Sequence, residues 1–221
     1  EEIFQEHVRY MQGMLYFLSH DERVPAFIRR ETGEFGLPAD EFTESGGWPH
    51  ELYVREARRM ISDYVMTEHN CIGGTEPEDP VALAAYTIDS HNCRRLVHFD
   101  RAFNEGNVEI RTPKPFPVSY RALVPKRGET ENLFVPWALS SSHIAFGSIR
   151  MEPVFMVLGQ VCATAADLAR ETGCAAQDVD YDRLRPRLLE GDIRLSWPVE
   201  GDTDPHKGVF KEFWHSAYKP W

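Results

Sequence analysis

Several signals that define broad classes of protein are missing from this 221-residue sequence. It has no apolar run of about 18 residues, the length that a membrane-spanning helix requires, so we expect no membrane span. The first residues, EEIFQEHVRY, are acidic and show no pattern of a cleavable signal. Lysine and arginine never run longer than a pair and the net charge is −11, which argues against a nucleic-acid partner.

The cysteines also lack a motif. The four residues, Cys71, Cys93, Cys162 and Cys174, contain no CxxC pair and no zinc-type spacing. Free, unreactive thiols are the simplest interpretation, and no metal site is predicted. The even count does not identify a compartment.

The composition is that of a folded protein. Hydrophobic residues make up 42% of the chain and charged residues 27%, which is ordinary for a globular domain. The chain is also long enough to bury a core without disulfides. The acidic balance leaves neutral or cationic small molecules as ligands.

Helical periodicity is clearest in the first third of the chain. Residues 1–20 carry one apolar stripe, which predicts an amphipathic helix: Phe4, Val8, Met11, Leu15 and Leu18. A second short helix is expected with Pro25 in its first turn and Gly33 just past its end. A Gly-, Pro- and acid-rich loop follows over residues 36–50, and the spacing of apolar residues then predicts a helix over residues 51–66.

Short β-branched and aromatic runs dominate the middle of the chain. They predict a mainly antiparallel sheet over residues 82–91, 94–100, 107–111 and 118–125. A further strand is expected over Asn132–Val135 and a helix over Pro153–Thr172, with Gly173 as its left-handed stop. A last short helix is expected within residues 179–191, where Pro186 would kink it or start it anew. The predicted fold class is α+β.

The helix expected from Pro153 has an unusual face. Gly159, Ala163 and Ala166 recur three or four apart and form a smooth strip. The strip permits close approach of a flat ligand, and ordinary helix packing is the alternative. The loop SSSHIAFGSIR leads into this helix, so backbone N–H groups and the positive end of the helix dipole would face a ligand there. An anionic ring such as a reduced flavin fits this environment, and so does a phosphate.

The segment NLFVPWALSSSHIAFGSIRMEPVFMVLGQVCATAA, residues 132–166, resembles the carboxyl-terminal flavin-binding segment of the FAD-dependent oxidoreductase family, whose members are often labelled xanthan lyase-like. HELYVREARRMISDYV, AAYTIDSHNCRR and YDRLRPRLLEGD resemble other segments of that family, so the similarity spans residues 48–192. The resemblance implies part of an α/β FAD-binding flavoenzyme fold, with FAD as the cofactor.

The resemblance divides the chain into four parts. These are a helical segment and loop (1–47), a substrate-side helix and sheet (48–130), a distal FAD-binding strand, loop and helices (131–192) and an irregular tail (193–221). Members of the family begin with a GxGxxG loop that binds the ADP half of FAD, and this sequence contains none. We therefore expect a carboxyl-terminal portion of a longer flavoenzyme, which alone would bind FAD weakly or not at all.

The resemblance also assigns roles to individual residues. His143 is the candidate base beside the flavin, since histidine changes protonation near neutral pH; an ordinary hydrogen-bonded turn residue is the alternative. Arg150 would lie near the pyrimidine edge of the flavin or act as a structural ion-pair partner. The cofactor-binding candidates are Ser141, Ser142, Arg150, Met151, Glu152 and Gly159. No GxSxG elbow surrounds the serine run, so a hydrolase is not favoured.

Substrate-binding candidates come from the predicted sheet and from the helix before it. Strand alternation sends Asp89 and His91 to one face, where they line a pocket or form a solvated surface. Arg55, with Arg58 and Arg59, binds a carboxylate or a sugar acid, or lies on a solvated helix face.

The reaction expected from the resemblance is hydride transfer from a small alcohol- or sugar-like substrate to flavin N5. A polysaccharide lyase of the xanthan type is one alternative, in which a His or Tyr takes a proton beside a uronate carboxylate. A noncatalytic ligand-binding module is another. The substrate, the electron acceptor, the compartment and the oligomeric state stay open.

Overall fold

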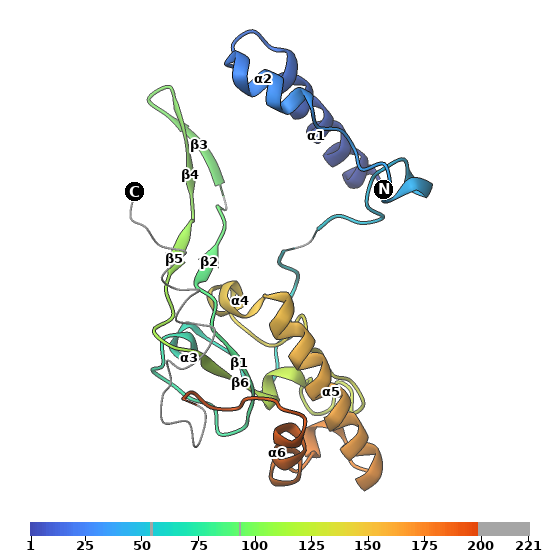
Figure 1. Cartoon of the computed structure of the whole chain (residues 1–221). Helices are drawn as coiled ribbons and strands as arrows, with labels where there is room; N and C mark the ends of the chain where they lie inside the picture. Colours follow the sequence, from blue (N-terminus) through green and yellow to red (C-terminus); the bar gives the residue numbers. More distant parts are fainter. Residues whose placement is uncertain (54, 93, 199–221) are drawn as a thin grey trace. The chain divides into compact units, whose positions relative to one another are not determined.

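The computed structural model describes residues 1–53, 55–92 and 94–198 (Figure 1). Its contacts divide the chain into two compact units, one over Glu1–Arg55 and one that begins at Glu56. In the second unit a run of short antiparallel strands is followed by the helices α4 (His143–Ile149), α5 (Glu152–Thr172) and α6 (Tyr181–Glu190), so the α+β class is confirmed. The predicted tail lies partly outside the described residues, from position 199 onward, as does Cys93.

The first unit is a pair of packed helices, α1 (Glu2–His20) and α2 (Ala26–Gly33), followed by the 3-10 turn η1 (Thr43–Ser45). Both predicted helices are therefore confirmed. Pro25 is the residue that caps α2, where its missing N–H leaves no donor unsatisfied. Gly33 closes α2 instead of following it.

The described part of the second unit contains three antiparallel strand pairs in place of one wide sheet. β1 (Pro80–Ala84) pairs with β6 (Phe116–Ser119), β2 (Ile88–Ser90) with β5 (Val108–Ile110), and β3 (Arg94–His98) with β4 (Arg101–Glu105). The pairs follow one another along a long two-stranded arm (Figure 1). The antiparallel pairing was predicted, whereas β4 was not. The predicted strand 118–125 ends early, because the 3-10 turn η2 (Tyr120–Leu123) follows Ser119.

The predicted helix over residues 51–66 is wrong. In the described part of this segment the backbone is irregular, and its N–H groups bond to a distant stretch of chain. Met60 N donates to Ala138 O at 2.9 Å, and Met66 N donates to Ser140 O at 3.0 Å. Met66 also forms a parallel bridge with Ser141. These long-range bonds replace the i to i−4 bonds of a helix, which the local apolar spacing could not reveal.

Two local predictions in the segment that resembles a flavin-binding segment are also wrong. Residues 132–135 are not a strand, and the predicted loop SSSHIAFGSIR is largely the helix α4 (His143–Ile149). Ser142 starts α4, since its Oγ accepts from the N–H of Ala145 at 3.2 Å. After one corner at Arg150 and Met151, α5 (Glu152–Thr172) continues at an angle of 92° to α4.

The carboxyl-terminal helices agree with the sequence. α5 begins one residue before Pro153 and ends at Gly173, whose φ of 64° is the left-handed stop. α6 (Tyr181–Glu190) contains Pro186 within its length. In the described part of the chain no single helix is long and apolar enough to cross a membrane; α4 and α5 reach that length and composition only together, across their bend.

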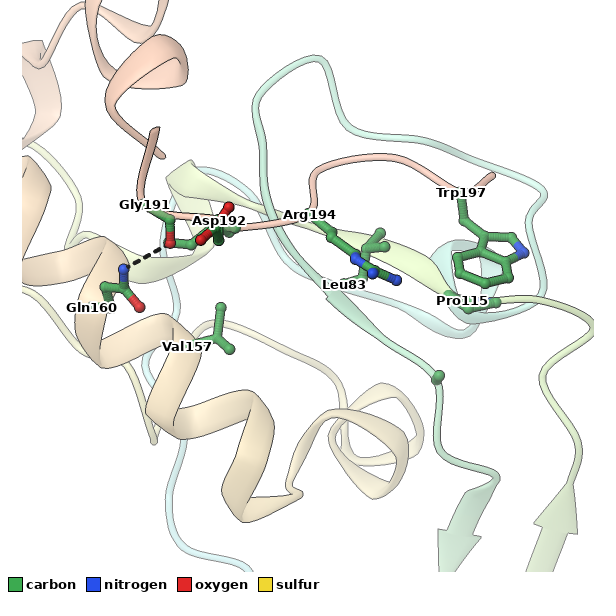
Figure 2. A pocket seen from close by; sticks show the side chains of 10 residues that line it. Leu83, Pro115, Val157, Gln160, Gly191, Asp192, Arg194 and Trp197 are labelled. Carbon is green, nitrogen blue, oxygen red and sulfur yellow. Dashed lines mark hydrogen bonds between the residues drawn. The ribbon is translucent and has the colours of Figure 1, made fainter. Parts of the chain in front are cut away.

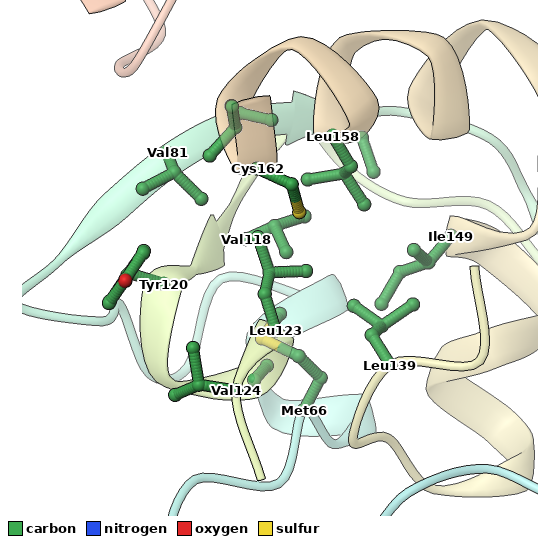
Figure 3. Close-up of a cluster of buried hydrophobic side chains, with 14 of the residues drawn as sticks. Met66, Val81, Val118, Tyr120, Leu123, Val124, Leu139, Ile149, Leu158 and Cys162 are labelled. Atoms are coloured by element: carbon green, nitrogen blue, oxygen red, sulfur yellow. The ribbon is translucent and has the colours of Figure 1, made fainter. Parts of the chain in front are cut away.

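The core of the second unit lies between α5 and the β1–β6 pair (Figure 3). One face of α5 is buried through Leu158, Val161, Cys162, Ala165 and Leu168. Val81, Val118 and Leu123 meet this face from the strands and from η2. Another short helix, α3 (Glu68–Cys71), adds a buried cysteine. This core fixes α5, and through the corner it fixes the start of the candidate site.

Candidate functional site

The site rests on the contact between α4 and β2, and a glycine makes that contact possible. A Cβ added to Gly147 would lie 2.8 Å from the carbonyl oxygen of Asp89, closer than real Cβ contacts. Ser148, the next residue, donates a short hydrogen bond from its Oγ to the carbonyl oxygen of Tyr86. The backbone of residues 143–150 therefore lies directly against that of residues 86–91. This contact brings the polar side chains of the two segments close together.

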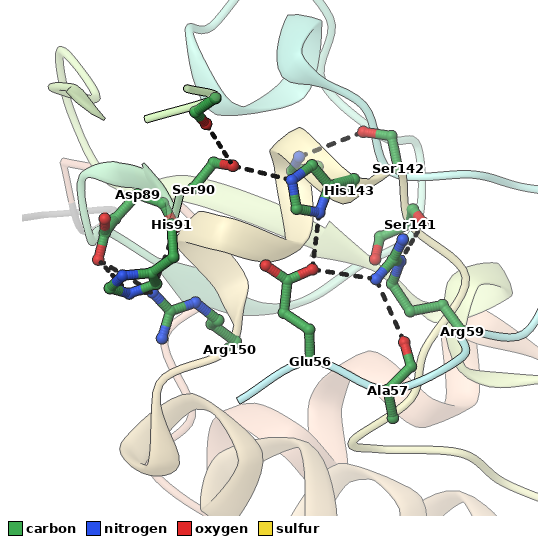
Figure 4. Close-up of polar contacts among 12 residues, drawn as sticks. Glu56, Ala57, Arg59, Asp89, Ser90, His91, Ser141, Ser142, His143 and Arg150 are labelled. Carbon is green, nitrogen blue, oxygen red and sulfur yellow. Dashed lines mark hydrogen bonds and ion pairs between the residues drawn. The ribbon is translucent and has the colours of Figure 1, made fainter. Parts of the chain in front are cut away.

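His143 is the centre of a three-residue hydrogen-bonded chain (Figure 4). Its Nδ1 lies 2.7 Å from Oε2 of Glu56, and its Nε2 lies 2.8 Å from Oγ of Ser90. Ser90 is 2% exposed, while the His143 side chain keeps 43% of its surface accessible. The imidazole thus connects a buried hydroxyl to a carboxylate and still presents an open edge.

Arg59 holds the carboxylate of this chain in place. Its Nη1 lies 3.3 Å from Oε2 of Glu56, and its Nε donates to the carbonyl oxygen of Ser141 at 3.0 Å. The guanidinium carbon also lies 5.3 Å from the centre of the Phe146 ring, within the range of a cation–π contact. One oxygen of Glu56, Oε2, is therefore held by both Arg59 and His143.

A second polar cluster lies beside the first, around Arg150 (Figure 4). Its Nη2 donates to Oδ2 of Asp89 at 2.9 Å and to the Asp89 carbonyl oxygen at 3.2 Å. His91 Nε2 lies 3.5 Å from the same Oδ2 and 3.4 Å from Nη2. Arg150 is 6% exposed, so its charge is balanced by Asp89 within the protein.

The predicted convergence of Asp89 and His91 on one face is what the structure shows, with Ile88 and Ser90 buried on the other. The alternative role considered for Arg150, an ion-pair partner, is also present. One atom of that arginine remains unsatisfied: Nε is buried and has no hydrogen-bond partner among the described residues. A buried donor without a partner is costly.

The remaining predicted site residues are less enclosed. Met151 is half-buried at the corner, and Glu152 is exposed in the first turn of α5. The sequence predicted free backbone N–H groups at the start of α5. The N–H groups of Val154 and Phe155 instead bond to the carbonyl oxygen of Met151. A Cβ at Gly159 would meet no atom within 4 Å.

The predicted small-residue strip of α5 does not pack into the described core, because Ala163 and Ala166 are exposed. Ser141 is buried beside Met66, and Ser142 caps α4. Arg55 is exposed and closes the first unit, so its substrate role stays a prediction.

Glu56 and the hydroxyl of Ser90 are the residues whose roles sequence reasoning missed. Glu56 lies 87 positions from His143 and was hidden in a predicted helix, while Ser90 was used only to set strand alternation. The sequence offered one indication of the role of Ser90. Strand alternation placed this serine on the buried face, and a buried hydroxyl needs a hydrogen-bond partner.

A separate pocket lies between α5, β1 and the chain after α6 (Figure 2). It has a volume of 330 Å³ and apolar walls that include Leu83, Pro115 and Val157. Gln160 reaches its edge and donates to the carbonyl oxygen of Gly191 at 3.2 Å. None of the residues singled out from the sequence lines this pocket.

Comparison with known families gives one decisive match. The model of the family described as FAD dependent oxidoreductase matches residues 1–188. The chain belongs to this family. No curated protein and no solved structure matches it. The FAD dependent oxidoreductase family accounts for nearly all of the described chain, so both polar clusters fall within the matched region.

Proposed function

We propose that this member of the FAD dependent oxidoreductase family takes part in hydride transfer from a small alcohol- or sugar-like substrate to flavin N5. Family membership supports FAD as the cofactor of the full-length protein. The observation that carries the proposal is the position of His143, an accessible imidazole held between a carboxylate and a hydroxyl. A base oriented by a third group is the arrangement that proton abstraction uses.

The residues around the α4–α5 corner fit a flavin. Arg150 offers a buried N–H without a partner, and the space over Gly159 is open. The first turn of α5 carries the positive end of a 21-residue helix. We propose that these residues hold the flavin together with Ser141, Ser142, Met151 and Glu152. Bound there, FAD supplies the hydride acceptor.

The protein's own residues would manage the proton and the substrate. His143 takes the proton of the substrate hydroxyl, and the carboxylate of Glu56 stabilises the imidazolium that results. Asp89 and His91 provide polar groups on the same edge for a hydroxylated substrate, and Arg55 is proposed to contribute a cation. Hydroxyl-rich ligands suit such a mixed set of donors and acceptors.

The cofactor part of the proposal is tested by titrating FAD and following the quenching of flavin fluorescence. We expect weak or no binding by residues 1–221 alone, because no GxGxxG loop is present. The full-length protein should bind FAD, and R150A should weaken that binding or shift the reduction potential. Tight stoichiometric binding to residues 1–221 alone, or an unchanged R150A variant, would contradict these expectations.

The reaction is tested anaerobically with FAD-loaded full-length protein and a panel of small alcohols and monosaccharides. Bleaching of the visible flavin band reports hydride transfer. H143Q should slow bleaching about 10²- to 10⁴-fold, the usual contribution of a general base, whereas H7Q on the exposed surface of α1 should not change it. Equal rates for H143Q and the wild-type protein would remove His143 from the reaction. An unsaturated uronate product formed without flavin would instead indicate lyase chemistry.

A further inference from the structure

The hydrogen-bonding capacity of each partner fixes the state of His143. An ionised carboxylate has acceptors and no donor, so at 2.7 Å from Glu56 Oε2 the His143 Nδ1 must carry the proton. In the neutral ring Nε2 then holds the lone pair, and it lies 2.8 Å from Ser90 Oγ. The Ser90 hydroxyl consequently donates to Nε2.

The same geometry accommodates the charged ring. When Nε2 takes up a proton it becomes a donor, and the Ser90 oxygen can accept from it. The Ser90 hydrogen then turns to the carbonyl oxygen of Gly106, which lies 3.4 Å from Oγ. Every polar atom keeps a partner in both states, and only one hydroxyl rotates.

We propose that Glu56 is a positioning residue that holds His143 in the Nδ1–H tautomer, so that the lone pair of the neutral ring lies on Nε2, where it accepts from Ser90. Arg59 supports this role, because it contacts the same Glu56 oxygen as the ring and is itself bonded to the Ser141 carbonyl oxygen. Ser90 is a hydroxyl switch that follows the protonation of Nε2. The use of this arrangement in catalysis rests on the proposed function, whereas the tautomer is a property of the protein alone.

The Ser–His–Glu order resembles that of a hydrolase triad, but its burial assigns a different role. An attacking serine must reach an acyl group, and Ser90 is 2% exposed beneath α4. The open surface belongs to the ring of His143. The serine therefore orients the imidazole in this protein and does not act as a nucleophile.

The tautomer is measurable by ¹⁵N NMR of histidine-labelled residues 1–221, at a pH where the imidazoles are neutral, with H143Q used to assign the signal. In the wild-type protein we expect a protonated Nδ1 and an unprotonated Nε2 for His143. His50 is the internal comparison, since its Nε2 faces Glu44 at 3.0 Å and the opposite tautomer is expected.

Three variants separate the partners. E56A should shift His143 toward the Nε2–H tautomer, S90A should leave it protonated on Nδ1, and the matched control E44A should leave the His143 signals unchanged. A wild-type His143 protonated on Nε2, or an E56A protein with the wild-type tautomer, would overturn the proposal. The wild-type measurement decides the matter even if E56A does not fold.

The outcome is also independent of the flavin experiments. Failure of FAD to bind or to be reduced would remove the proposed function and leave the tautomer measurement standing. Conversely, the wrong tautomer in a protein whose H143Q variant is slow would retain the base and reject Glu56 as the group that positions it.

Discussion

The contact between α4 and β2 gives a quantitative prediction for G147A. An added Cβ would lie 2.8 Å from the Asp89 carbonyl oxygen, whereas ordinary contacts begin at 3.4 Å, so the helix and the strand must separate by about 0.6 Å. Overpacking of this kind costs about 1–3 kcal/mol. Replacing glycine by alanine within a helix returns about 0.5–1 kcal/mol, so a net loss of up to about 2.5 kcal/mol is expected.

G159A is the matched control, because it is also a helical glycine and its added Cβ meets nothing within 4 Å. G159A should show only the stabilisation that alanine gives within a helix. The difference in free energy of unfolding between the two variants then measures the cost of the close contact, about 1–3 kcal/mol. Urea unfolding followed by circular dichroism measures both values. A G147A protein as stable as G159A would refute the inferred backbone contact, and with it the mechanism that places Ser90 beside His143.

Three further predictions concern the rest of the second unit. D79A should lower the free energy of unfolding by about 1–3 kcal/mol, because Asp79 accepts from the buried Ser119 hydroxyl at 2.7 Å; D63A, at an exposed carboxylate, is the control in the same urea assay, and equal losses would contradict the reasoning. Burial raises the pKa of both Cys71 and Cys162 from 9.0 to about 12, so at pH 8 neither should react with a disulfide reagent until the protein unfolds, and prompt labelling of either in the native state would be evidence against their burial. Because these two pKa values are higher in the folded state, the unfolded chain loses its thiol protons first as the pH rises; the free energy of unfolding should therefore fall between about pH 9 and 12, and C71A should flatten that slope.

Local signals predicted α1, α2 and α5 well. The stripe in residues 1–20, Pro25 before α2 and Gly173 after α5 each act within a turn or two of their own position. The same holds for the alternation that buries Ser90 and brings Asp89 and His91 together. These features depend on backbone geometry that neighbouring residues decide.

The errors have a common physical cause. Residues 51–66 have helical spacing of apolar side chains, yet their backbone donors bond to residues 138–140. Residues 143–149 look like a loop of small and polar residues, yet Ser142 caps them and Gly147 lets them pack against β2. In both segments, contacts between parts of the chain far apart in sequence override local preference, and those contacts build the environment of His143.

The bend between α4 and α5 limits how many residues can join the two helices. An α-helix turns about 100° per residue, so one residue inserted at Met151 would rotate α5 by that angle about its axis. The row that contains Leu158 and Leu168 would swing out of the interior, and the row that contains Gln160 and Asp167 would swing inward. A change in the number of residues at this corner would therefore disturb the whole buried face of α5.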